Sequence, residues 1–144
     1  MGNFDGDADL EVVFSGYSSG NVIWALNADG SAVDGFPVGL GEKVKIGVAL
    51  ADFNGNGKDD IVVGTVSDYI HLIYDDGSEA PGFPYQVGDK IQSAPSILDV
   101  DGQKVIFVGS NDNNLYAVNN DGSLRFSVGA TNNVLNSPAF LKHN

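Results

Sequence analysis

Short apolar runs separated by polar turns are the main pattern along this chain. The runs are rich in valine, isoleucine and aromatic side chains, and clusters of Gly, Asn, Asp and Ser bound them, which is typical of β-strands. No segment has the periodicity of an amphipathic helix. The pattern therefore predicts an all-β protein. We expect strands at residues 10–15, 21–27, 36–40, 46–53, 60–66, 69–74, 83–87, 94–100, 104–109, 114–118, 124–128 and 138–141.

Several of these runs are apolar on consecutive residues instead of alternate ones. The sequences DIVVG (60–64) and VIFVG (105–109) are examples. Consecutive side chains of a strand point to opposite faces of its sheet, so such a strand needs cover on both faces. We therefore expect stacked sheets rather than a sheet with one face in water.

The chain also repeats itself. Residues 34–55 align with residues 81–102 at a constant offset, so that Asp52 falls on Asp99 and a Gly-Phe-Pro element recurs. Strands that recur about every 45 residues and need cover on both faces are typical of β-propeller blades. We expect one propeller segment of three four-stranded blades, at about residues 1–45, 46–92 and 93–144.

The strand count leaves the ends of this segment unpaired. The first repeat begins with its second strand, and a spare first strand at 138–141 follows the third repeat. Three blades do not close a ring, since four to eight are typical. Two arrangements fit: a partial propeller that is a piece of a larger one, or two chains joined head to tail as a homodimer in a six-bladed ring. The turn-like start, MGNFDGD, carries no signal sequence and favours a fragment.

The segment DFNGNGKDD (52–60) has the composition of a calcium loop. Ca²⁺ takes six to eight oxygen ligands, and a short loop supplies them when alternate residues turn inward. An EF-hand is excluded because its glutamate position holds Val63 and the flanking segments are predicted strands. The expected ligands are the side chains of Asp52, Asn54, Asn56 and Asp60 and the backbone carbonyl of Lys58.

The segment NFDGDADLE (3–11) repeats this arrangement, although Asn3 and Ala8 replace the aspartate and glycine of a typical loop. The third copy, DVDGQK (99–104), is shorter, so we predict no ion there. The alternative for all three is that Asp, Asn and Gly form ordinary polar turns. The expected ligands of the first loop are the side chains of Asn3, Asp5, Asp7 and Glu11 and the carbonyl of Asp9.

Charge narrows the range of partners. The chain has 19 acidic and 7 basic residues and a net charge of -12, so it repels nucleic acid and anionic membranes, and we expect neither as a partner. Cations are favoured instead. Without cysteine there is no disulfide and no thiolate metal site. No apolar run approaches the roughly 20 residues of a membrane-spanning helix.

Candidate catalytic side chains are few. His71 has apolar neighbours in a predicted strand, and we expect it to be a strand residue without a catalytic role. The chain contains no nucleophile elbow, metal-binding histidine pair or phosphate-binding glycine loop. Trp24 matches the strand position of Leu72 and is predicted to pack in the core. Lys43 and Lys90 recur before a predicted strand and are expected at the surface.

The motif D-x-N-x-N-G-x-x-D-I-V-V-G, together with GNVIWALNADG, GFP and SAPSILDVDG, resembles the FG-GAP/VCBS repeats of β-propeller proteins such as integrin α-chains. This resemblance implies calcium bound between the first two strands of a blade, in a structural role. It also implies an extracellular or periplasmic location and a role in adhesion or binding. The same two loops, at 3–11 and 52–60, are the implied Ca²⁺ sites.

We therefore expect a calcium-stabilised repeat module that binds or scaffolds a protein or a carbohydrate and has no catalysis of its own. The alternative is a fragment of a propeller enzyme. The segments NNLYAVNNDGSL and NVIWALNADGS also resemble quinoprotein dehydrogenase repeats. A polysaccharide-acting enzyme is the other enzymatic alternative.

Overall fold

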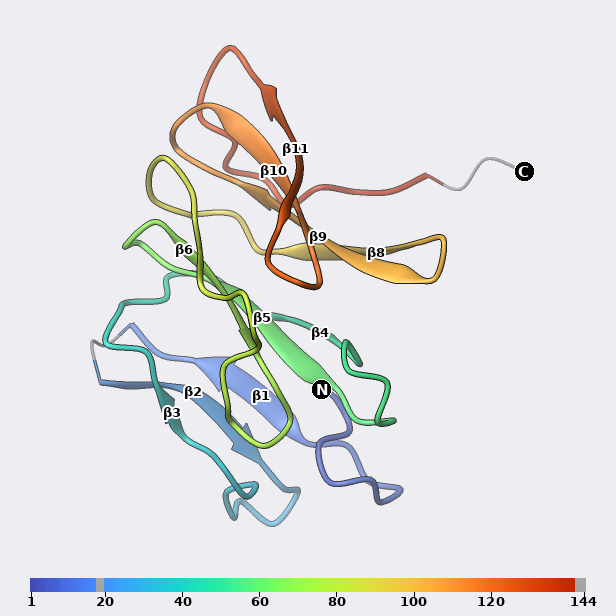
Figure 1. The fold of residues 1–144 in the computed structure, drawn as a ribbon. Coiled ribbons are helices and arrows are strands. Elements are labelled where there is room, and N and C mark those ends of the chain that lie inside the picture. Colours follow the sequence, from blue (N-terminus) through green and yellow to red (C-terminus); the bar gives the residue numbers. More distant parts are fainter. Residues whose placement is uncertain (18–19, 142–144) are drawn as a thin grey trace.

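The structure, a computed structural model, describes residues 1–17 and 20–141. Within these residues the chain forms no helix. Three antiparallel sheets are stacked face to face (Figure 1). The predicted all-β fold of stacked propeller blades is confirmed.

Each sheet follows the chain in order. The first sheet contains β1 (Val12–Ser15), β2 (Asn21–Leu26) and β3 (Val38–Gly39). The second contains β4 (Ala49–Ala51), β5 (Asp60–Gly64), β6 (Tyr69–Ile73) and β7 (Tyr85–Gln86). The third contains β8 (Ser96–Val100), β9 (Gln103–Gly109), β10 (Asn114–Asn119) and β11 (Leu124–Gly129). The first sheet lacks the counterpart of β4 and β8, as the strand count predicts.

The strand predicted at 138–141 is wrong. These residues run away from the third sheet and have no strand beside them in the described part of the chain (Figure 1). A strand exists only where a neighbour completes its backbone hydrogen bonds. The segment contacts the sheet without pairing with it: the Ser96 hydroxyl donates to the Pro138 carbonyl at 2.7 Å, and the Phe140 ring packs on Phe107.

The consecutive apolar residues of β5 explain the stacking. Val62 and Val63 are both fully buried, but they point to opposite faces of the second sheet. Val63 packs towards the first sheet in a cluster with Ile23 and Phe36. Val62 packs towards the third sheet in a cluster that includes Ile106. One strand therefore contributes to two inter-sheet cores.

Glycines allow the sheets to approach closely at their turns. The predicted turns at 75–77 and 120–122 are present, with φ of +83° at Gly77 and +81° at Gly122. A Cβ at Gly77 would overlap the carbonyl of Gly35, and one at Gly122 would overlap the carbonyl of Gly82. Each turn is therefore in backbone contact with the Gly-Phe-Pro element of the preceding sheet. Of the third predicted turn, Ser18 and Ser19 lie outside the described residues.

The strand register corrects the predicted position of Trp24. Trp24 pairs with Phe14 on β1, as His71 pairs with Val63 on β5. Tyr116 occupies the same place on β10, opposite Val108. Trp24 is therefore the counterpart of His71 and not of Leu72, because one residue separates the two faces of a strand.

Candidate metal centre

The two acidic loops occupy equivalent places in the first and second sheets. Loop 2 (52–60) joins β4 to β5, and Ala51 pairs with Asp60 where the two strands meet. Loop 1 (3–11) precedes β1, and Gly2 bridges Glu11 in the same way. Both loops therefore close at a backbone pair that brings their first and last residues together.

The first side chain of each loop holds the following turn. The Gly6 amide donates to Asn3 Oδ1 at 2.7 Å, and the Gly55 amide donates to Asp52 Oδ1 at 2.6 Å. Asp52 also accepts from the Gly57 amide at 2.8 Å through Oδ2. An Asn or Asp side chain that accepts from amides further along the chain curls the backbone around its own oxygen atoms.

The third and fifth side chains continue the curl. The Asp7 amide donates to Asp5 Oδ1 at 3.0 Å, and the Asp9 amide donates to Asp7 Oδ1 at 2.7 Å. Loop 2 repeats both bonds: Asn54 Oδ1 accepts from the Asn56 amide at 3.0 Å, and Asn56 Oδ1 accepts from the Lys58 amide at 2.8 Å. The two loops share one hydrogen-bond pattern despite their different sequences.

The last carboxylate of each loop is buried under it. Glu11 is 2% exposed and accepts from the Phe4 amide at 2.7 Å. Asp60 is 0% exposed and accepts from the amides of Phe53 at 2.8 Å and Asp75 at 3.0 Å. Burial raises the pKa of Asp60 to about 6, because the ionised form loses its hydration.

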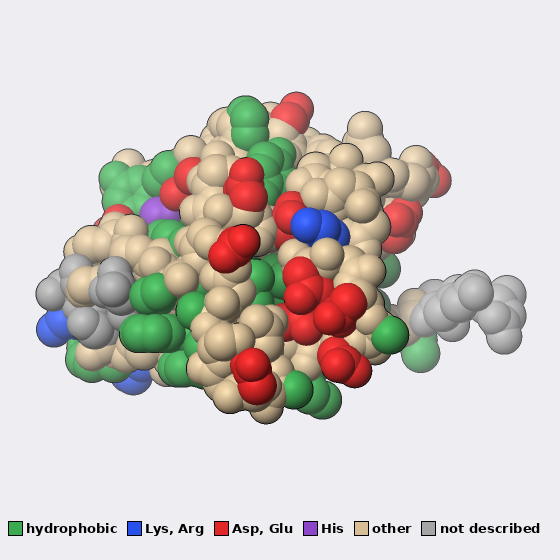
Figure 2. Space-filling view, turned by 90° about the horizontal axis from the view of Figure 1, so that it is seen from below, with side chains coloured by type: hydrophobic (Ala, Val, Ile, Leu, Met, Phe, Trp, Pro, Cys, Tyr) green, Lys and Arg blue, Asp and Glu red, His purple; other side chains and the backbone are tan. Residues whose placement is uncertain are grey.

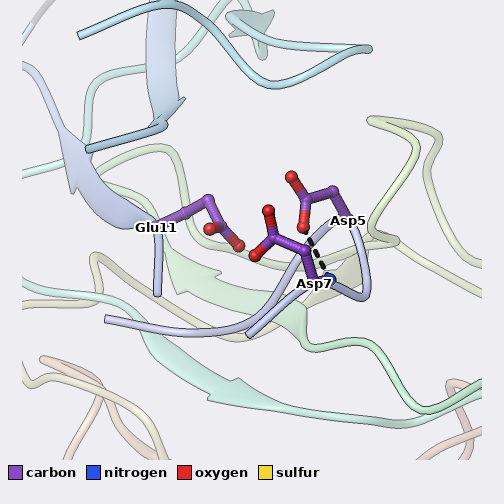
Figure 3. A group of neighbouring side chains, drawn as sticks. All are labelled: Asp5, Asp7 and Glu11. Atoms are coloured by element: carbon purple, nitrogen blue, oxygen red, sulfur yellow. Dashed lines mark hydrogen bonds between the residues drawn. The ribbon is translucent and has the colours of Figure 1, made fainter. Parts of the chain in front are cut away.

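Loop 1 gathers three carboxylates around one point. One oxygen each from Asp5, Asp7 and Glu11 lie within 4.8 Å of one another, and the side chains face each other in Figure 3. They line a hollow of about 320 Å³ together with Asp29 of the neighbouring turn. Hard oxygen atoms at this spacing suit a divalent cation such as Ca²⁺.

Loop 2 offers a less charged set of donors. Its predicted carboxylate ligands are Asp52 and Asp60, and amide oxygens of Asn54 and Asn56 take the places of Asp5 and Asp7. Lys58 Nζ lies 3.3 Å from Asp75 Oδ2, so this side chain points to the neighbouring turn. The donor chemistry of both loops fits Ca²⁺, with the stronger negative charge in loop 1.

The two loops also contact each other, which the sequence pattern did not indicate. The Asn3 amide donates to Asp59 Oδ2 at 3.1 Å, and the Asp59 amide donates to the Asn3 carbonyl at 2.7 Å. Asp59 lies between two predicted ligands, Lys58 and Asp60, and falls outside the spacing that predicts ligands. Only the stacking of the first two sheets brings it to loop 1.

The third acidic segment is a tight hairpin instead of a loop. Asp99 pairs with Lys104, and the turn between β8 and β9 has positive φ at Asp101 (53°) and Gly102 (80°). The Gly102 amide donates to Asp99 Oδ1 at 2.9 Å. The two missing residues are those that would form the curl, so the absence of an ion here stays a prediction with a geometric reason.

A second group of titratable side chains surrounds His71 of β6. His71 is 4% exposed; its Nδ1 lies 2.9 Å from Glu79 Oε2 and its Nε2 lies 3.5 Å from Glu42 Oε2. The Thr65 hydroxyl donates to the same Glu42 oxygen at 2.5 Å. His71 is a packed strand residue held by two carboxylates, and sequence spacing did not indicate either partner.

Comparison with known families agrees with the loop geometry. The FG-GAP-like repeat family matches residues 3–63, a segment that contains both loops and ends in β5. The predicted family is thereby confirmed over this segment. Among curated proteins, none matches the chain.

Solved structures support the fold beyond the FG-GAP-like segment. BBS1N, crystallised in complex with ARL6DN and soaked with lead, is similar with a TM-score of 0.62 and 14% identity over 89% of this chain. The chain spans 42% of that structure's length. The computationally designed Ika4 protein is similar with a TM-score of 0.58 and 14% identity, over 96% of this chain and 84% of Ika4. At this identity the likeness concerns the fold alone. The described residues contain no helix that could cross a membrane.

Proposed function

We propose that this chain is a calcium-stabilised propeller segment that binds or scaffolds a protein or a carbohydrate outside the cytoplasm. The observation that carries the proposal is the hydrogen-bond pattern shared by loops 1 and 2. Five oxygen-bearing positions recur in the same order, and each loop closes on a buried carboxylate, Glu11 or Asp60. Calcium would join the curl to that carboxylate and hold the first two strands of each blade together.

Burial supports a cation at these positions. A carboxylate that is removed from water is stabilised by a nearby positive charge. Neither Glu11 nor Asp60 has a Lys, Arg or His within ion-pair distance among the described residues. A divalent ion would supply the missing charge and would leave the backbone contacts of both carboxylates in place.

We propose binding or scaffolding instead of catalysis because the loop carboxylates already have a structural role. The carboxylates predicted as ligands accept from backbone amides of their own loops, so they maintain loop shape. Propeller rims of this kind present loops on a rigid frame, which suits recognition of a partner. Calcium at millimolar concentrations is a feature of extracellular modules, which supports the proposed location.

Calcium titration followed by calorimetry tests the proposal. We expect two sites with dissociation constants of about 10⁻⁴ to 10⁻³ M. Asp5→Asn with Asp7→Asn should remove the site of loop 1, since the amide oxygens keep the turns and the charge is lost. Asp52→Asn should weaken the site of loop 2, which loses one charge and one of the two acceptor oxygens of Asp52. A matched control, Asp76→Asn with Asp121→Asn, changes exposed carboxylates of the equivalent turns in the second and third sheets and should keep both sites. Wild-type protein that binds no calcium at 10 mM would contradict the proposal.

A further inference from the structure

The exposed large hydrophobic side chains are confined to the two ends of the stack. Among the described side chains none of them belongs to the second sheet, whereas the first and third sheets, the residues on either side of β1 and the final segment carry all of them. Figure 2, which views the molecule from the side of the first sheet, shows hydrophobic side chains gathered beside the acidic ones. The exposed large hydrophobic side chains of the two ends together are Met1, Leu10, Val12, Phe14, Tyr17, Leu124, Phe126, Val128, Leu135, Phe140 and Leu141.

The first free face belongs to β1 and β2. Register places Val12 and Phe14 where the second sheet has Ile61 and Val63. Ile61 and Val63 are fully buried because the first sheet covers them, whereas Val12 is 46% and Phe14 is 43% exposed. Phe14 stacks on Trp24 with parallel rings and centroids 6.1 Å apart. The first sheet therefore presents an apolar surface of the kind that is covered elsewhere.

The second free face belongs to the third sheet. Phe107 occupies the position of Val62, which the third sheet covers completely in the second blade. Phe107 is covered mainly by Phe126 and Phe140, whose ring centroids lie 6.1 and 5.1 Å from its own. These two covering rings are 42% and 43% exposed. This end of the stack is also apolar and lacks a sheet above it.

We propose that the second copy of a head-to-tail dimer covers both faces, with the first sheet of each copy packed on the third sheet of the other. At both inter-sheet contacts inside the chain, the face of one sheet that corresponds to Val62 packs against the face of the next sheet that corresponds to Val63. The first free face corresponds to the Val63 face and the second free face to the Val62 face. A second copy therefore repeats the packing that already joins neighbouring sheets inside the chain. Six stacked sheets lie within the four to eight that close a propeller ring. The contact does not require calcium in either loop.

Backbone pairing gives this contact a register. β1 is an edge strand, and its neighbour in the other blades is the first strand of the sheet. The Val134 amide donates to Ser110 at 3.1 Å, as the Ile91 amide donates to Thr65 at 3.0 Å five residues before β8 begins. The segment after Val134 is therefore placed like the segment that leads into β8. Ala139 would then pair with Val13 of the second copy.

The contact between copies differs from the internal ones at one turn. Gly30 has a φ of +86°, like Gly77 and Gly122, but no atom lies within 4 Å of the position of its Cβ. Inside the chain, Gly35 and Gly82 fill that space, and the third sheet has no equivalent Gly-Phe-Pro element. The association between copies therefore depends on the apolar strands, chiefly Phe14 and Phe126.

Sedimentation in calcium-containing buffer at about 50 μM protein tests this proposal, because a contact of micromolar affinity is then largely formed. The wild-type chain of 15.1 kDa should sediment at twice that mass. Phe14→Asp and Phe126→Asp should each give monomers, since every contact joins the first free face of one copy to the second free face of the other. An equimolar mixture of the two variants should regain dimers, because one contact then retains both native faces. Phe14→Leu and Phe126→Leu, which keep the faces apolar, should stay dimeric.

The mixing experiment separates this geometry from others. Far-ultraviolet circular dichroism confirms that each variant is folded before it is mixed. Wild-type monomers at this concentration would overturn the proposal. It would also be overturned if only one of the two aspartate variants dissociated, because like faces would then be joined, or if the mixture of variants stayed monomeric.

Discussion

The Asn3 amide donates to Asp59 Oδ2 at 3.1 Å, and the Asp59 amide donates to the Asn3 carbonyl at 2.7 Å. This pair ties the first residue of loop 1 to the last turn of loop 2. Asn3 Oδ1 at the same time accepts from the Gly6 amide, so its backbone and side chain join the two loops. The shape of loop 1 therefore depends on the position of the second sheet.

Asp59→Ala should destabilise the protein by about 1 kcal/mol, because it removes the acceptor of the Asn3 amide. It should also weaken calcium binding in loop 1 more than in loop 2, since Asn3 is the first proposed ligand. Urea unfolding and calorimetry measure the two effects. Asp34→Ala is the control, because this exposed carboxylate lines a hollow beside Phe4 and Asp5 but forms no side-chain hydrogen bond among the described residues. Equal losses in both variants would contradict the coupling.

Calcium should raise the melting temperature if both loops bind it. At 10 mM Ca²⁺ and a dissociation constant of about 1 mM, each site adds about 1.4 kcal/mol to the free energy of unfolding. In a domain of this size that corresponds to roughly 3 to 6 °C per site. Glu11→Gln should remove the increment of loop 1 alone, because its amide keeps an oxygen for the Phe4 amide. A melting temperature that does not respond to calcium would exclude stabilisation by these loops.

Gly77→Ala should destabilise the protein much more than Gly30→Ala. The two glycines have similar φ, +83° and +86°, so the backbone strain of an alanine is the same, about 1 kcal/mol. Only Gly77 lies against a neighbouring sheet, where the new Cβ would overlap the Gly35 carbonyl. The difference between the melting temperatures of the two variants measures the cost of the overlap with the neighbouring sheet. Similar melting temperatures would show that this turn contact has little effect on stability.

The Tyr116 hydroxyl donates to Asp112 Oδ2 and sets a pH dependence. Burial raises the pKa of Asp112, but hydrogen bonds from Tyr116 and Asn114 outweigh burial and hold it below its usual value. Its stabilising contribution is therefore present above pH 4 or so and is lost as the pH falls through the lowered pKa. In Tyr116→Phe the pKa should move up, so acid unfolding should begin at a higher pH. Urea midpoints measured across pH 2 to 6 or so test this, with Tyr17→Phe as the control.

The same pair shifts the tyrosine titration. Burial, followed by the hydrogen bond to Asp112, raises the pKa of Tyr116 to about 12. The contribution of the neutral hydroxyl to stability is present below the ordinary value of about 10 and is lost as the pH rises through the folded pKa. Asp112→Asn should lower the Tyr116 pKa, since it removes the neighbouring negative charge. Absorbance at high pH, with Tyr116→Phe used to assign the group, measures the shift; an unchanged midpoint would contradict it.

His71→Leu should destabilise the protein by about 2 kcal/mol, because the hydrogen bonds of Glu79 and Glu42 to a buried imidazole ring are lost. The additional change Glu79→Gln should recover part of the loss, since it removes one unpaired charge. A double-mutant cycle from denaturant unfolding measures this coupling. Additive effects of the two substitutions would show that His71 and Glu79 act independently.

The sequence alone determined the features that neighbouring residues encode. Consecutive apolar residues such as Val62 and Val63 indicated sheets covered on both faces, and both side chains are fully buried. Side-chain oxygens at alternate positions of loops 1 and 2 indicated the curl, and the observed hydrogen bonds span only two to five residues. Such contacts form within one segment, so spacing along the chain is enough to predict them.

Only the tertiary structure decided which segments meet. Asp59 reaches Asn3 across a sequence separation of 56 residues, and His71 reaches Glu42 across 29. The place of Trp24 on a free face, and the lack of a strand at 138–141, depend on which sheet lies beside them. Stacking and register arise from the whole molecule, because a shift of one residue turns a side chain to the other face. Local spacing contains no information about that choice.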